Sequence, residues 1–180
     1  AKILADMGMD AESVCAALLH DVVEDTETTS EEIRAIFGES IEQLVDGVTK
    51  LGQIPLSASK EEQQSENVRK MFLAMSRDIR VIIIKLADRV HNMRTLMFMP
   101  EEKKRYKARE TLEIYAPIAH RLGIRAFKEE LEDLAISYLD PVAYNEIRDS
   151  LEKQSQSRNE FLADVQARIE DRVKTVVPNA

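Results

Sequence analysis

A shortage of helix-breaking residues, combined with repeated helix-capping signals, constrains this chain to an all-α fold. Its 180 residues include only five glycines and five prolines, and no stretch alternates apolar and polar residues as a half-buried strand does. Asp10 and Asp78 can each cap a following helix, and capping-box patterns begin at Thr29 and Ser59. We therefore expect an all-α bundle of roughly seven to nine helices.

The predicted helices are separated by short connections. Gly38 is expected to stop one of them and Pro117 to kink another. The apolar run at residues 81–84 alone is compatible with a buried strand, but the apolar residues after it keep helical spacing and favour a buried helix. Residues 53–59 are predicted to form a loop. The predicted helices cover residues 11–25, 30–37, 40–52, 59–76, 79–97, 100–120, 124–139 and 141–173.

Composition excludes several classes of protein. With 44% hydrophobic and 32% charged residues, the chain can fold as a globular domain. No apolar run approaches the roughly 20 residues that span a bilayer, so no membrane partner is expected. Cys15 is the single cysteine and cannot form an internal disulfide, which fits a reducing cytoplasm. The chain starts with Ala and its last segment closes no recognisable element, so we expect a piece of a longer protein, truncated at the N terminus.

Charge is segregated along the chain. Residues 1–68 hold 4 Lys or Arg and 15 Asp or Glu, residues 69–109 hold 12 and 4, and residues 110–180 hold 9 and 14. An acidic part followed by a basic part is what a metal site facing a polyanionic substrate requires, because carboxylates hold the cation and Arg or Lys holds phosphates. The alternative explanation is a set of solvated helix faces.

The segment around His20 carries the strongest chemical signal. His20 and Asp21 follow an apolar run, and Glu24 and Asp25 come one helical turn later. On a helix these separations place the side chains on one face. An imidazole with several carboxylates favours Mn²⁺ or Mg²⁺, whereas a structural zinc site is usually built from thiolates. A carboxylate beyond the ion can orient or deprotonate water. The alternative is a histidine that caps the core beside acids on an exposed face.

A second polar stripe interrupts an otherwise apolar helix about sixty residues later. Asp88, Asn92 and Thr95 fall at i, i+4 and i+7 and therefore share one face. Asp88 can supply the next metal ligand, while the other two side chains can hydrogen-bond a sugar or a base. Three basic side chains of the same segment are available to phosphates or to structural ion pairs, namely Lys85, Arg89 and Arg94.

The two motifs together resemble the hydrolase domain of the RelA/SpoT-type alarmone enzymes, which belong to the HD-domain metal phosphohydrolases. The resemblance rests on His-Asp-Val-Val-Glu-Asp-Thr at residues 20–26 and Lys-Leu-Ala-Asp-Arg-Val-His-Asn-Met-Arg-Thr-Leu at residues 85–96. It extends over residues 1 to about 150, and the last helix resembles the segment that leads to the family's synthetase domain. We therefore expect an HD-type hydrolase domain at residues 1–140 and a connecting helical segment at residues 141–180.

The resemblance also implies roles for individual residues. The implied reaction removes the 3′-pyrophosphate from guanosine tetra- or pentaphosphate (ppGpp or pppGpp), which yields GDP or GTP and pyrophosphate. The implied partners are these guanine nucleotides and covalently linked synthetase and regulatory domains, with no DNA. The implied Mn²⁺ ligands are His20, Asp21 and Asp88. The acidic pair implicated in hydrolysis is Glu24 and Asp25, and the implied nucleotide contacts are Asn92 and Thr95.

One departure from the family pattern bears on activity. The family supplies a further metal-binding histidine and basic nucleotide contacts from a helix that precedes this chain, and no residue here matches them. We therefore expect little or no hydrolase activity from the 180 residues alone, and hydrolysis by the longer protein. Two other functions remain open: an HD phosphohydrolase that acts on another nucleotide, and a non-catalytic regulatory module of a (p)ppGpp synthetase (GTP pyrophosphokinase).

Overall fold

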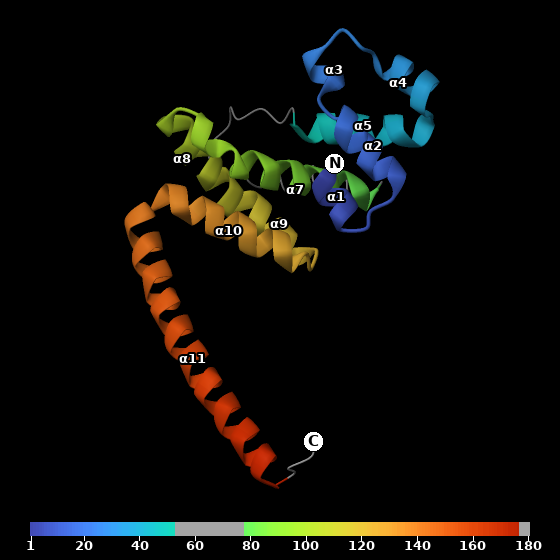
Figure 1. The fold of residues 1–180 in the computed structure, drawn as a ribbon. Helices are drawn as coiled ribbons and strands as arrows, with labels where there is room; N and C mark the ends of the chain where they lie inside the picture. Colours follow the sequence, from blue (N-terminus) through green and yellow to red (C-terminus); the bar gives the residue numbers. More distant parts are fainter. Residues whose placement is uncertain (53–77, 177–180) are drawn as a thin grey trace. The chain divides into compact units, whose positions relative to one another are not determined.

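The computed structural model describes residues 1–52 and 78–176, and every regular element in these two ranges is helical (Figure 1). The all-α prediction is confirmed. The predicted loop at residues 53–59 and the predicted helix at residues 59–76 lie outside the described residues. The chain forms two compact units, Ala1–Tyr138 and Leu139–Ala180.

The first unit begins with short helices joined by tight connections. Asp10 caps the second helix, because its carboxylate accepts from the Ser13 amide at 2.7 Å. The predicted capping box at Thr29 is present, and Gly38 ends the same helix with a φ of 92°, a conformation that favours glycine. The helices are α1 (Lys2–Asp6), α2 (Ala11–Leu19), α3 (Val22–Asp25), α4 (Ser30–Phe37) and α5 (Glu39–Gly52).

The predicted single helix over residues 11–25 is wrong, because α2 stops at Leu19. The single turn α3 starts after Asp21, whose carbonyl oxygen accepts from two amides of the new turn. The His20 carbonyl oxygen lies at the break and accepts from the Thr49 hydroxyl of α5 at 3.3 Å. A hydrogen bond from a distant helix thus replaces one that a continuous helix would have formed internally.

The buried helix α7 (Ile79–Arg94) carries the second motif. Asp78 caps it as predicted, since its carboxylate accepts from the Arg80 amide at 2.9 Å. The apolar run at residues 81–84 is helical, which confirms the prediction of a buried helix over a strand. The helix ends a few residues earlier than predicted, and the 3₁₀ turn η1 (Leu96–Phe98) follows it.

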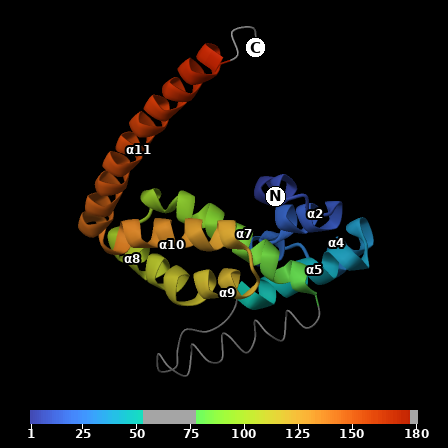
Figure 2. The ribbon, with the colours of Figure 1, turned by 90° about the horizontal axis from the view of Figure 1, so that it is seen from below.

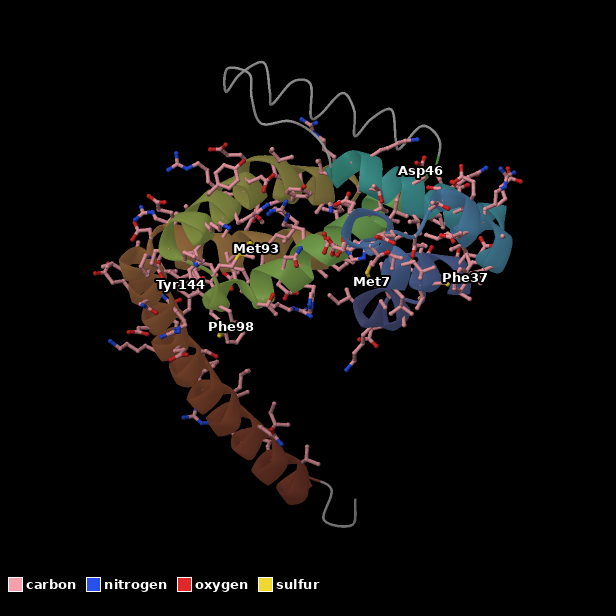
Figure 3. The ribbon with its side chains drawn as sticks, turned by 90° about the horizontal axis from the view of Figure 1, so that it is seen from above. Met7, Phe37, Asp46, Met93, Phe98 and Tyr144 are labelled. Carbon is pink, nitrogen blue, oxygen red and sulfur yellow. The ribbon has the colours of Figure 1, made fainter. Side chains whose placement is uncertain are left out.

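The core of the first unit lies where α2 and α5 pack against α7 (Figure 2). Nearer the C-terminal end of α7, Met93 is 1% exposed and contacts Thr111, whereas Phe98 in η1 is 83% exposed (Figure 3). Gly47 allows α5 to approach α7 closely, because a Cβ added there would lie 2.8 Å from Cγ2 of Val81. Fully buried apolar side chains from these three helices are Ala16, Leu44, Val45, Val48, Ile82, Ile84, Leu86 and Val90.

The rest of the first unit is built from α8 (Glu101–Glu110), the π-helical segment η2 (Thr111–Tyr115), α9 (Ala116–Arg121) and α10 (Arg125–Leu139). Pro117 was predicted to kink a helix running through this region. The departure from α-helical geometry lies just before it, in η2. A π turn is a common way for a helix to absorb a local irregularity, and it often occurs at functional sites.

The second unit is the helix α11 (Pro141–Val176), which Asp140 caps by accepting from the Ala143 amide at 3.0 Å. Its start at Pro141 agrees with the prediction. Among residues 1–52 and 78–176, no helix combines the length and the apolar character needed to cross a bilayer.

We predict that Gly47→Ala destabilises the first unit. The new methyl group would meet the stiff, buried side chain of Val81, so overpacking should outweigh the higher helix propensity of alanine and lower the free energy of unfolding by about 1–2 kcal/mol. Urea unfolding followed by circular dichroism measures the change. In a Val81→Ala background the same substitution should no longer destabilise, and equal costs in both backgrounds would contradict the proposed contact.

Candidate metal centre

His20 occupies the break between α2 and α3, and its ring is held on one side by the backbone. Its Nδ1 lies 3.1 Å from the Ala17 carbonyl oxygen. Because a carbonyl oxygen can only accept, Nδ1 carries the hydrogen, and the other ring nitrogen, Nε2, is unprotonated in the neutral ring. The tautomer thus presents the Nε2 lone pair to the opposite side of the ring.

Two carboxylates face this nitrogen. His20 Nε2 lies 3.1 Å from an Asp21 oxygen and 3.5 Å from an Asp88 oxygen. Asp21 comes from the same break in the chain, whereas Asp88 comes from the middle of α7, 68 positions away from His20. The structure therefore brings together the three side chains that the two motifs singled out as metal ligands.

The chemistry of this group fits a divalent cation. Nε2 is buried and makes no hydrogen bond among the described residues, and a lone pair that faces two carboxylates is repelled unless a proton or a metal ion lies between them. Two ligand atoms at about 2.1 Å from one ion are about 3.0 Å apart at a right angle and about 3.4 Å apart at a tetrahedral angle. The 3.1 Å separation from Asp21 lies within that range, and the 3.5 Å separation from Asp88 lies slightly above it.

The side chains do not enclose an ion as they stand. Within the described part of the chain, no group of three or more His, Cys, Asp and Glu side chains is placed so that it could hold a metal ion. Asp88 is engaged by two neighbours on α7, the Asn92 amide at 2.9 Å and the Lys85 ammonium at 3.1 Å. Asp21 is 58% exposed and is therefore free to rotate. Binding of an ion therefore requires these side chains to move.

Charges in the cluster shift the pKa values of its members. Burial raises the pKa of Asp88, but the His20 ring and the Lys85 ammonium outweigh burial and lower the pKa to about 2. The Asp88 carboxylate raises the pKa of His20, although burial of the ring opposes this effect. Both pKa shifts have the same physical cause, which is the attraction between the negative charge on Asp88 and positive charge next to it.

The polar stripe predicted on α7 exists. Asn92 and Lys85 both contact Asp88. Thr95 continues the stripe at the end of the helix, where its hydroxyl donates to the His91 carbonyl oxygen at 3.1 Å. The Asn92 side-chain oxygen and the Thr95 hydroxyl oxygen keep acceptor capacity. The stripe can therefore offer hydrogen bonds to a polar ligand beside Asp88.

The structure does not bring the two arginines into this stripe. Arg89 is 7% exposed, donates to Glu110 at 2.8 Å and stacks on the Tyr115 ring, with 3.9 Å between its guanidinium carbon and the ring centroid. Arg94 forms a two-bonded pair with Glu130 of α10, at 2.5 and 2.9 Å. Both arginines tie α7 to other helices, and phosphate binding by either remains a prediction that requires it to leave its partner.

Glu24 and Asp25 lie on α3, where both side chains are exposed. Neither makes a hydrogen bond or an ion pair with His20 or with any other described residue. Asp21 is the N-cap residue of α3, so both follow it within one turn, whereas His20 belongs to the end of α2. They are held near the cluster by one short turn.

Sequence reasoning missed two supporting features. Thr49 was not singled out, although a polar residue within the apolar stripe of the helix at residues 40–52 was a usable signal. Glu110 and Tyr115, which hold Arg89, belong to a different helix, and no sequence spacing pointed to them. Long-range pairs of this kind require the tertiary structure.

A family model described as the HD domain matches residues 1–125, well over half of the chain. The chain belongs to the HD-domain family. The predicted family is therefore confirmed, and the match includes both the His20–Asp21 break and the whole of α7.

Curated relatives of this HD domain are considerably longer than the chain. The chain is 50% identical over 176 residues to the guanosine-3′,5′-bis(diphosphate) 3′-pyrophosphohydrolase of Vibrio cholerae, an alignment that covers 98% of this chain and 25% of the relative. It is 49% identical over 174 residues to the bifunctional (p)ppGpp synthase/hydrolase SpoT of Escherichia coli, which aligns with 97% of this chain over 25% of its own length. It is 53% identical over 161 residues to the GTP pyrophosphokinase of Streptomyces coelicolor, which aligns with 89% of this chain over 19% of its own length. The chain spans about a fifth to a quarter of these relatives' length, and the resemblance to RelA/SpoT-type enzymes is confirmed.

We predict that Glu110→Gln lowers the free energy of unfolding by about 3 kcal/mol, because it leaves the buried Arg89 guanidinium without its charged partner. Chemical unfolding of the variant measures the loss. Glu129→Gln is the matched control: it breaks the Arg125–Glu129 pair, which is exposed, and should change stability by no more than about 0.5 kcal/mol. Equal effects of the two substitutions would show that the Arg89 pair is not buried as described.

Proposed function

We propose that this chain is the HD domain of an Mn²⁺-dependent (p)ppGpp 3′-pyrophosphohydrolase, which converts ppGpp to GDP, or pppGpp to GTP, with release of pyrophosphate. The observation that carries the proposal is the convergence of His20, Asp21 and Asp88 from two distant segments. The names of the Vibrio cholerae and Escherichia coli relatives support the choice of substrate. We further propose that the longer protein works in the cytoplasm, in keeping with the free thiol of Cys15.

In this proposal His20, Asp21 and Asp88 hold the ion. An imidazole and two carboxylates are donors that Mn²⁺ accepts readily. When bound, a divalent ion would supply Lewis acidity to the 3′-diphosphate, whose ester bond to the ribose is the bond that water breaks, and would acidify that water. The ring of His20 is already oriented by the Ala17 carbonyl oxygen, so little rotational freedom is lost when the nitrogen binds.

The remaining roles fall to side chains around the ligands. Glu24 and Asp25, exposed on α3, are proposed to accept a proton from the attacking water. Asn92 and Thr95 are proposed to hydrogen-bond the nucleotide, and Lys85 to neutralise phosphate charge. Lys85 is the basic residue best supported for that task, since its ammonium already lies 3.1 Å from Asp88.

We propose that the complete protein supplies further ligands. Three protein side chains leave part of an Mn²⁺ coordination sphere to other donors, and the family resemblance assigns one of these positions to a histidine that precedes residue 1. The domain division that we propose is a hydrolase domain at residues 1–140 and a connecting segment at residues 141–180. Linked synthetase and regulatory domains are part of the same proposal, and the length of the relatives supports it.

We predict that Asp88→Asn in the full-length protein abolishes Mn²⁺-dependent release of pyrophosphate from ppGpp, with a fall in kcat of more than about 100-fold, because the ligand from α7 is lost. A pyrophosphate-release assay with added Mn²⁺, or with a chelator in its place, measures the effect. Asp46→Asn is the matched control: it breaks a carboxylate–lysine pair on α5 and should change kcat by less than about twofold. Undiminished hydrolysis by the Asp88 variant would refute the proposal.

We predict that the 180-residue chain hydrolyses ppGpp far more slowly than a chain extended at its N terminus, because the extension completes the metal site. Single-turnover assays of both proteins at equal Mn²⁺ concentration make the comparison. Equal rates would show that His20, Asp21 and Asp88 are sufficient.

The relative named GTP pyrophosphokinase supports a second candidate function, that of a regulatory module in a synthetase. A domain that binds guanine nucleotide tightly, without Mn²⁺-dependent release of pyrophosphate, would be a regulatory module of a synthetase. Release of phosphate or pyrophosphate from other nucleotides, but not from ppGpp, would instead identify an HD phosphohydrolase of different specificity. Product analysis with ppGpp, GTP and dNTPs separates these outcomes.

A further inference from the structure

Arg80 gathers three carboxylates at the start of α7. Its guanidinium contacts Asp78 at 2.7–3.1 Å, Asp10 at 3.1 Å and Glu12 at 3.0 Å. Asp78 caps α7, and Asp10 caps α2, so the arginine joins the N-terminal ends of two helices that are distant in sequence. Glu12 also accepts from the Ser40 hydroxyl at 2.6 Å, which adds the start of α5 to the group. We call these five side chains the Arg80 cluster.

Along each of the helices α2, α5 and α7, nearly the same length separates the Arg80 cluster from the candidate metal centre. Ten residues lead from Asp10 to His20 along α2, and ten lead from Asp78 to Asp88 along α7. On α5, nine residues lead from Ser40, in the cluster, to Thr49, which donates to the His20 carbonyl oxygen. At 1.5 Å per residue, each path is about 14–15 Å long. The three helices therefore run in the same direction and are cross-linked at two levels.

We propose that Arg80 is a positioning residue for the metal centre: by fixing the starts of α2 and α7 at one level, it sets the register that places His20 opposite Asp88. The expected effect on metal binding rests on the proposed function, whereas the role of Arg80 in aligning α2 with α7 does not depend on that function. A slip of one residue would move one helix by about 1.5 Å along its axis. That movement is large compared with the tolerance of about 0.2 Å on a metal–ligand distance.

The chemistry of the cluster requires arginine. Only a planar guanidinium has donors directed to several carboxylates at once, whereas an ammonium acts as a single point charge. Hydrogen bonding to Asp78, and then to Glu12, raises the pKa of Arg80 further above its ordinary value, so the cluster keeps its positive centre at any physiological pH. The side chain is only 26% exposed, and partial burial strengthens these contacts relative to an open surface pair.

The test compares Arg80→Gln, Arg80→Lys and the control Arg34→Gln in the full-length protein. Arg34 forms a surface pair with Glu39 between α4 and α5 and lies outside the Arg80 cluster, so its loss removes one arginine–glutamate pair without touching the register of α2 and α7. Two measurements are made on each variant. The first is the dissociation constant of Mn²⁺, from the electron paramagnetic resonance signal of the free ion. The second is hydrogen exchange by mass spectrometry, without metal.

For Arg80→Gln we expect the Mn²⁺ dissociation constant to rise about threefold to tenfold, less than the 10- to 100-fold typical of a residue bonded directly to a ligand. We also expect faster exchange in peptides that cover the break at residues 17–26, about 15 Å from the substitution. Arg80→Lys should give intermediate values, and Arg34→Gln should match the wild type. A merely local structural role predicts faster exchange only next to residues 10–12 and 78–80, with unchanged Mn²⁺ affinity, and that result would overturn the proposal.

Two further outcomes are informative. If the wild type binds no Mn²⁺ but Arg80→Gln still speeds exchange at residues 17–26, the register role stands and the proposed function fails. If Arg80→Gln does not fold, Asp10→Asn carries the test, because asparagine keeps the helix cap while losing the charge that pairs with Arg80. It should produce the same two effects at smaller size, and the absence of both would overturn the proposal.

Discussion

The first unit depends on one electrostatic constraint: a single imidazole nitrogen faces two carboxylates. His20 Nε2 lies 3.1 and 3.5 Å from Asp21 and Asp88, an arrangement that repels itself unless positive charge is present. The surrounding structure supplies part of that charge. The break after α2 places His20 and Asp21 next to Asp88 of α7. The Thr49 hydroxyl of α5 donates to the His20 carbonyl oxygen at the break, and the absence of a side chain at Gly47 lets α5 approach Val81 of α7.

Each side of α7 makes different contacts. One side buries Val90 and Met93 in the core. A second carries Asp88, contacted by Lys85 and Asn92, toward His20 in the candidate metal centre. The arginines lie on other sides and attach the helix to its neighbours through Glu110 and Glu130. A helix anchored on several sides cannot rotate, and that rigidity keeps a ligand in place where the partner helix is broken.

Local signals in the sequence were sufficient to predict most of the helices. The caps at Asp10, Thr29 and Asp78 and the stop at Gly38 act within three or four residues, so their outcome follows from short-range chemistry. The convergence of His20 with Asp88 was also predictable in kind, because buried polar groups on apolar helices need partners.

Features decided by distant contacts did not follow from such signals. The helix predicted over residues 11–25 breaks after Leu19, where a hydroxyl from α5 takes the place of an internal bond. For Arg89 the sequence left phosphate binding and a structural ion pair open, and the ion pair that it forms beside Tyr115 depends on how α8 and η2 pack. Neither outcome is encoded in the spacing of nearby residues.

The salt bridge between Lys85 and Asp88 has a consequence for how the centre exchanges charge. Both groups are largely shielded from water, at 17% and 14% exposure, so the ammonium acts as a tethered counter-ion for the carboxylate. In the proposed function, a dication held by Asp88 would replace this counter-ion, whereas a monovalent ion would gain little by replacing one positive charge with another. The displaced ammonium would stay within a turn of Asp88, where it could pair with an anionic substrate.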